Sequence, residues 1–159
     1  MKEKKVLISS VGNPYRRDDG VGIEVIKILE SENKDPNVAL FDAGTDGLSL
    51  LDQLSLYEKA VIIDAVSMNE PPGEVKLFFP EEAKIKITRD ALSTHGFGLA
   101  EVLKLADELN IKTEIKIVGI EPEDIGFGEG LSDVVRDKIP FILDLIKKEM
   151  ASLSLRTTS

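Results

Sequence analysis

Apolar and polar residues are arranged along this chain in two alternating patterns. Apolar runs with the length of buried strands occupy residues 6–11, 38–42, 59–66 and 114–120. Stretches with apolar side chains at helical spacing follow them, at residues 21–29, 48–56, 99–109 and 132–150. Strands that alternate with helices predict a three-layer α/β/α sandwich around a mostly parallel, twisted sheet of about five strands.

Two local features refine this prediction. Residues 73–79 alternate in polarity after a Pro-Pro-Gly turn, which predicts an additional edge strand. Pro140 lies inside the last helical stretch and should kink or split that helix, because proline lacks the backbone N–H that a helix interior needs. The chain has 159 residues, enough to bury one core, so we expect a single domain over residues 1–159.

Composition excludes several classes of protein. The 29 acidic and 20 basic residues give a net charge of −9, which opposes the phosphate neutralisation on which nucleic-acid binding depends. With no cysteine and one histidine, the chain has no disulfide, no thiolate metal site and no three-histidine zinc site. No apolar run approaches the ~20 residues of a membrane-spanning helix, and the start lacks a signal-peptide pattern. We therefore expect a cytoplasmic protein without nucleic-acid or membrane partners.

Carboxylates and the single histidine follow the predicted strands. Asp19 lies in the GNPYRRDDGVG turn after the first strand, Asp42 opens the DAGTDG turn after the second, and Asp64 ends the third. His95 lies in STHGFG, before a predicted helix. Because the carboxyl ends of parallel strands meet at one edge of a sheet, these side chains are expected to converge there. Asp19, Asp64 and His95 are the primary candidates for a metal site.

Each candidate also has a structural alternative. Asp18 and Asp19 could cap the following helix, although one aspartate is enough for a cap. Asp64 could pair with a nearby lysine or arginine, Asp42 could cap a helix, and a lone histidine is often a surface or core residue. A buried, unpaired carboxylate costs several kcal/mol, so Asp64 needs a partner of some kind.

The donor set limits the chemistry. Two carboxylates and one imidazole, with open coordination positions, suit Ni, Zn, Mn or Fe better than Ca or Mg. Neither GxxxxGK[ST] nor GxGxxG is present, so no nucleotide cofactor is predicted. A Ser-His-Asp triad could be drawn from Ser93 or Ser10, but no GxSxG turn exists to present the serine.

The motifs taken together resemble those of the hydrogenase maturation endopeptidases. GNPYRRDDGVG, DAGTDG, IIDAV, STHGFGLAEVL and VGIEPEDIGFGEGLS occur in that order and span most of the chain. The resemblance implies an enzyme that removes a C-terminal extension from the large-subunit precursor of a [NiFe]-hydrogenase after nickel insertion. It also implies that Asp19, Asp64 and His95 contact the metal, and it gives Asp42 some support as a residue that handles substrate.

The resemblance leaves the mechanism open between an aspartic-type and a metal-dependent peptidase. We interpret the nickel as presented by the substrate, the nickel-loaded precursor, and not held permanently; Asp19, Asp64 and Asp42 are then the candidates for catalysis. Two alternatives remain. A non-catalytic, nickel-checking chaperone would use the same ligands, and the GNP turn is also similar to that of peptidyl-tRNA hydrolases, whose RNA substrate the acidic charge disfavours.

Overall fold

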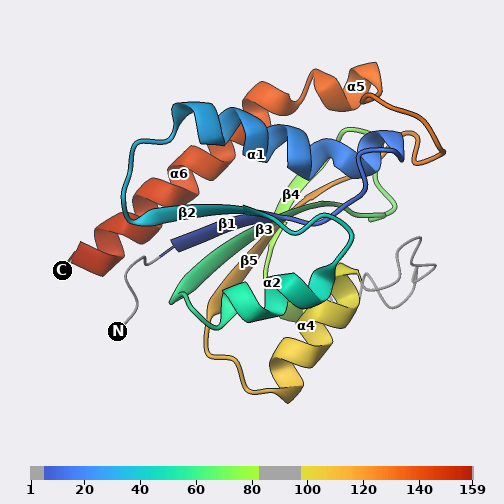
Figure 1. Ribbon diagram of the computed structural model, residues 1–159. Coiled ribbons are helices and arrows are strands. Elements are labelled where there is room, and N and C mark those ends of the chain that lie inside the picture. Colours follow the sequence, from blue (N-terminus) through green and yellow to red (C-terminus); the bar gives the residue numbers. More distant parts are fainter. Residues whose placement is uncertain (1–5, 83–97, 159) are drawn as a thin grey trace.

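The computed structural model describes residues 6–82 and 98–158. In these residues a five-stranded sheet has the order β2-β1-β3-β5-β4 (Figure 1). The parallel strands are β1 (Val6–Ser10), β2 (Val38–Asp42), β3 (Lys59–Ala65) and β5 (Glu114–Ile120). β4 (Val75–Phe78) pairs antiparallel with β5 at the edge, which confirms the strand predicted after the Pro-Pro-Gly turn.

Helices cover both faces of the sheet (Figure 1). One face carries α1 (Val21–Glu32), α5 (Asp133–Arg136) and α6 (Ile139–Thr158). The other face carries α2 (Gly47–Leu54) and α4 (Leu99–Glu108). The predicted three-layer α/β/α sandwich is therefore confirmed.

The two faces arise from side-chain alternation within strands that are buried on both sides. On β3, Ile62 belongs to the hydrophobic cluster under α2 and α4, while Ile63 belongs to the cluster under α1 and α6. Leu7 and Ile8 on β1 divide in the same way. A strand with helices on both faces has no solvent side, which explains its continuous apolar sequence.

The predicted C-terminal helix is split. α5 ends at Arg136 and α6 begins at Ile139, so Pro140 is the second residue of the new helix. Proline is tolerated in the first turn because the N–H groups there have no partner within the helix.

The parallel strands end on the right of Figure 1, where the turn after β1 and the loop after β5 also lie. Beside β1 are β2 on one side and β3 on the other, so the connections after β1 and β3 leave the sheet in neighbouring positions. Crevices at such points are the usual ligand sites of open α/β sheets.

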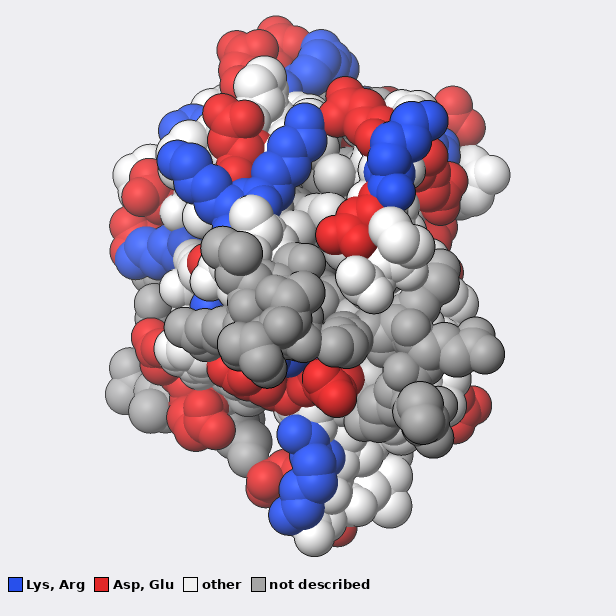
Figure 2. Space-filling model, turned by 90° about the vertical axis from the view of Figure 1, so that its left-hand side faces the viewer, with Lys and Arg blue, Asp and Glu red and all other residues white. Residues whose placement is uncertain are grey.

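The opposite edge carries both signs of charge. Figure 2 shows this face, where lysine and arginine side chains are interspersed with aspartate and glutamate among the described residues. No helix in residues 6–82 and 98–158 is long and apolar enough to cross a membrane.

The contact between α1 and the sheet gives a first prediction. A Cβ at Gly22 would lie 2.7 Å from the Ile63 carbonyl oxygen and 2.8 Å from Ser10 Cβ, so the helix has to move away if this residue is larger. Overpacking costs about 1–3 kcal/mol, which exceeds the gain of about 1 kcal/mol from replacing a helical glycine by alanine. Gly22→Ala should therefore lower the free energy of unfolding in urea. The exposed Glu30→Ala on the same helix is the control, and a G22A protein more stable than wild type would contradict the close contact.

Candidate functional site

The candidate site lies at the carboxyl ends of β1 and β3. Ser10, the last residue of β1, is paired in register with Ile63, so the turn after β1 begins beside Asp64. A short 3-10 helix, η1 (Arg17–Gly20), carries Asp18 and Asp19 and contacts β3. Residues far apart in the sequence, Asp19 and Asp64, are thus brought to one place.

Asp64 is a buried carboxylate that lacks a full set of partners. It is 7% exposed, and its Oδ1 atom has no hydrogen-bond partner among the described residues. Burial raises the pKa of Asp64 well above its usual value, and the nearby charge of Asp19 raises it further, while a hydrogen bond from the Ala65 backbone acts in the opposite direction. A bound cation would supply the partner that this buried oxygen lacks.

Asp19 is held in the turn by the backbone. Its Oδ2 atom accepts a hydrogen bond of 2.8 Å from the Asn13 N–H, and only 4% of the residue is exposed. Gly12 makes this turn possible: its φ of +152° suits glycine, and a Cβ there would lie 2.0 Å from the Asp19 carbonyl oxygen. Gly12 therefore allows two backbone segments to pass closer together than a side chain would permit.

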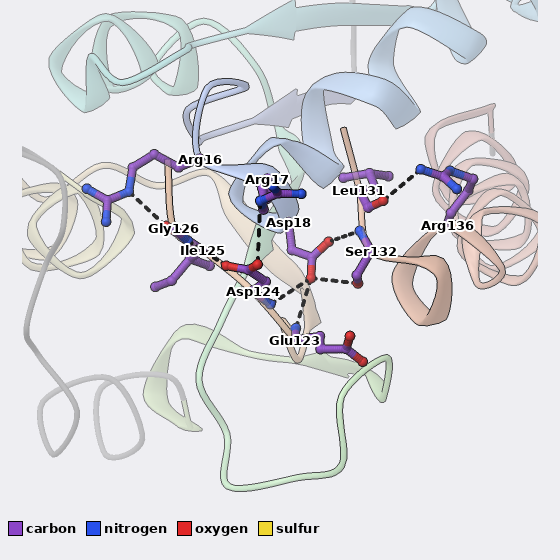
Figure 3. A network of polar contacts seen from close by, with 10 residues as sticks. All are labelled: Arg16, Arg17, Asp18, Glu123, Asp124, Ile125, Gly126, Leu131, Ser132 and Arg136. Carbon is purple, nitrogen blue, oxygen red and sulfur yellow. Dashed lines mark hydrogen bonds and ion pairs between the residues drawn. The ribbon is translucent and has the colours of Figure 1, made fainter. Parts of the chain in front are cut away.

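Asp18 has a different role from its neighbour. It is fully buried, and its two oxygens accept bonds from the N–H groups of Glu123 (2.9 Å), Asp124 (3.0 Å) and Ser132 (2.7 Å) and from the Ser132 hydroxyl (2.8 Å), as Figure 3 shows. Its oxygens are thus occupied by the loop after β5. The capping interpretation of this acidic pair is wrong, because Gly20 is the N-cap of α1 and no side chain caps that helix.

We call residues 121–132 the bracing loop. Besides its bonds to Asp18, this loop accepts a hydrogen bond from Arg17 N–H at the Gly128 oxygen, and Gly128 N–H donates to the Tyr15 oxygen. Arg17 has a left-handed φ of +47°, which costs about 1–2 kcal/mol in a residue with a side chain. The bracing loop therefore stabilises a turn conformation that the turn alone would not favour.

Glu121, the first residue of the bracing loop, holds the loop that follows β3, the strand that carries Asp64. It is 7% exposed, and its Oε1 atom accepts bonds from Met68 N–H (2.7 Å) and Glu70 N–H (3.0 Å) in the loop after β3. Neither Glu121 nor Ser132 was predicted from the sequence to be a functional residue. Glu121 could have been found, since it is a carboxylate at the end of an apolar strand like Asp64; Ser132 has no such pattern.

The two remaining candidates are Asp42 and His95. Asp42 ends β2 and is exposed, and its Oδ1 atom accepts bonds from the Gly44 N–H (2.8 Å) and the Ser10 hydroxyl (3.2 Å). Asp46, and not Asp42, caps the following helix. His95 lies outside the described residues. Within the described residues no group of three histidine, cysteine or acidic side chains could hold a metal, so Asp19 and Asp64 contribute a pair at most.

Comparison with known proteins identifies the family. A sequence model described as "hydrogenase maturation protease" matches residues 23–149. The chain belongs to the hydrogenase maturation protease family. Such proteases cleave a C-terminal extension from the hydrogenase large subunit, so the chain is a peptidase and the sequence resemblance is confirmed.

Individual relatives and structures agree with this assignment. A putative hydrogenase maturation protease of Methanocaldococcus jannaschii is 31% identical, with 93% of this chain and 100% of the relative covered. The hydrogenase maturating endopeptidase HybD from Escherichia coli matches with a TM-score of 0.82 at 26% identity, covering 93% of each chain. The protease HybD from Thermococcus kodakarensis matches with a TM-score of 0.70 at 30% identity, covering 91% of this chain and 97% of the other.

The raised pKa of Asp64 gives a prediction about stability. A group whose folded pKa is above its unfolded value, about 3.9 for aspartate, contributes stability below that pH and loses it as the pH rises through the folded pKa. In chelator-treated protein at pH 7, Asp64→Asn should therefore raise the free energy of unfolding by more than the ~0.5 kcal/mol typical of surface changes. The gain should shrink toward pH 4. The exposed Asp52→Asn should show no such trend, and a destabilised D64N protein at pH 7 would refute the burial argument.

The bonds of Asp18 give a second prediction. Asp18→Asn removes the charge and turns an amide N–H₂ toward N–H donors, so the free energy of unfolding should fall by about 3 kcal/mol. Asp124→Asn, in the bracing loop, removes an exposed ion pair with Arg17, while the amide oxygen can still accept the Gly126 N–H bond, so stability should change by less than about 0.5 kcal/mol. Urea unfolding of both proteins measures the difference, and equal stabilities would show that the Asp18 network contributes little.

Proposed function

We propose that this protease removes the C-terminal extension of a [NiFe]-hydrogenase large-subunit precursor only after nickel has been inserted. The observation that carries the proposal is the pair of buried carboxylates, Asp19 and Asp64, with one Asp64 oxygen that no described residue bonds. The nickel in the precursor would complete the coordination of this oxygen. Cleavage would then depend on the metal that the client brings.

His95 is proposed as the third side chain that contacts nickel. Leu99, the first residue of α4, packs in the same hydrophobic cluster as Ile62 and Val66, which lie two positions on either side of Asp64. His95 is four residues before Leu99, and four residues span at most ~14 Å. Chain length alone therefore keeps His95 within ~14 Å of Leu99, a member of this cluster.

The proposed chemistry is hydrolysis of one peptide bond in the precursor. A carboxylate of the Asp19–Asp64 pair takes a proton from water, the water oxygen attacks the scissile carbonyl carbon, and the proton passes to the leaving amine as the C–N bond breaks. Burial keeps the pKa of Asp64 high in the metal-free protein, so bound nickel and protons compete for it. Asp42, at the exposed end of β2, is retained as a second candidate near the substrate.

We further propose that the enzyme acts as a single domain in the cytoplasm on the nickel-loaded precursor, without a permanently held metal or a nucleic-acid partner. The proposed site would bind nickel weakly and through few ligands. A site that bound nickel tightly would extract the metal from its client. Family membership disfavours the two alternatives, a non-cleaving chaperone and a peptidyl-tRNA hydrolase, since the related proteins are proteases.

The test is cleavage of nickel-loaded and nickel-free precursor from the same organism, followed by the mass of its C-terminus. Wild-type protein should release a defined tail only from the loaded precursor. Asp19→Asn and His95→Ala should each lower the rate about 100-fold or more, because each removes a group at the reacting centre. Asp52→Asn serves as the control for loss of a carboxylate. Equal cleavage of nickel-free precursor would refute the nickel requirement, and normal rates in the D19N and H95A proteins would refute the assigned residues.

A further inference from the structure

Arg16 is fixed beside the site more firmly than a surface arginine normally is. Its Nε–H donates to the Ile125 carbonyl oxygen at 3.0 Å, and its guanidinium carbon lies 4.8 Å from the centre of the Phe127 ring. Its backbone N–H donates to the Asn13 oxygen at 3.1 Å. The side chain is half-buried, and its plane and direction are set by the bracing loop.

Among the described residues, no hydrogen bond or ion pair involves the two terminal nitrogens of the Arg16 guanidinium. In Figure 3 the guanidinium extends away from Asp18 and Ser132, with only Nε bonded to the loop. Within residues 6–82 and 98–158, no carboxylate pairs with Arg16, although Arg17 pairs with Asp124 and Arg136 pairs with Asp133. In a chain with 29 acidic residues, an arginine that is held in place and left without a carboxylate needs a reason.

The aromatic ring beneath Arg16 is also unusual. Phe127 is 83% exposed and Tyr15, across the backbone bridge at Gly128, is 63% exposed. An exposed phenylalanine contributes little to folding, but its face attracts a guanidinium and restricts its motion. Phe127 therefore serves to hold Arg16 and to offer apolar surface beside it.

This group is adjacent to the acidic centre and chemically distinct from it. The Asp19 N–H donates to the Arg16 carbonyl oxygen at 3.1 Å, so both residues belong to one turn. A guanidinium cannot bind a nickel ion, but its planar fork fits a carboxylate with two parallel N–H···O bonds. Because Arg16 is already ordered, such a bond costs little additional side-chain entropy.

We propose that Arg16, supported by Phe127, is a carboxylate-binding subsite that holds the client polypeptide while Asp19 and Asp64 engage the metal centre. The proposal rests on the proposed function, since the client is the precursor. The carboxylate belongs either to the C-terminal residue of the extension or to an acidic side chain of the client.

Steady-state cleavage of the nickel-loaded precursor tests the subsite. Arg16→Ala should raise KM about tenfold and leave kcat within about twofold, because the contact positions substrate without taking part in bond cleavage. Arg16→Lys keeps the charge without the fork and should recover only part of the loss. Phe127→Ala should raise KM about threefold, because the guanidinium loses its support. Lys27→Ala, on the exposed side of α1, is the control for loss of one positive charge. An unchanged KM in the R16A protein, or a loss confined to kcat, would overturn the proposal.

Two altered precursors distinguish the sources of the carboxylate. One has an amidated C-terminus, and the other has the acidic residues of its extension replaced by the corresponding amides. One of these changes should raise KM for wild-type protein and leave KM for the R16A protein unaltered. If neither change affects wild-type KM, the subsite is refuted.

A binding measurement separates this proposal from the proposed function. The Arg16 Nε–H signal should be observable by NMR, since it is hydrogen-bonded, and should shift with saturation on addition of N-acetylglycine but not of sodium chloride at equal ionic strength. Absence of a saturable shift would refute the subsite whether or not the precursor is cleaved. If wild-type protein leaves every precursor uncut, the proposed function fails, and the titration still decides the carboxylate site.

Discussion

The full hydrogen bonding of one buried charge, Asp18, determines the geometry of this edge of the molecule. A carboxylate that is removed from water has to be compensated, and here the compensation comes from a segment more than 100 residues away in the sequence. The turn after β1 and the bracing loop after β5 are thereby joined across β3. The left-handed residue Arg17, the position of Asp19 and the direction of Arg16 all depend on this junction.

The two carboxylates Asp18 and Asp64 illustrate how burial produces opposite results. Both are almost completely removed from solvent, yet Asp18 accepts backbone and hydroxyl bonds on both oxygens, whereas one oxygen of Asp64 has no partner among the described residues. The first arrangement rigidifies the structure. The second leaves a cost of burial that a bound cation would remove, and in the function proposed above that cation is the nickel of the client.

The bracing loop connects structure and recognition. Its first residue, Glu121, holds the loop after β3, its middle holds the guanidinium of Arg16, and its last residue, Ser132, holds Asp18. One segment of chain thus supports both the turn that carries Asp18 and Asp19 and the loop that follows Asp64. A rigid support of this kind keeps the side chains of the turn after β1 and of the loop after β3 in place.

The sequence by itself determined the layers, the mostly parallel sheet and the family of this protein. The spacing of apolar residues locates strands and helices, because an element buried on one face or on both has apolar side chains at regular positions. It also placed Asp19 in the turn after one strand and Asp64 near the end of another, at the edge where parallel strands bring polar groups together. Only the tertiary structure decided which of the adjacent acids, Asp18 or Asp19, is consumed by hydrogen bonds. That choice depends on Ser132 and the backbone of Glu123 and Asp124, and contacts between such distant segments leave no periodic trace in the sequence.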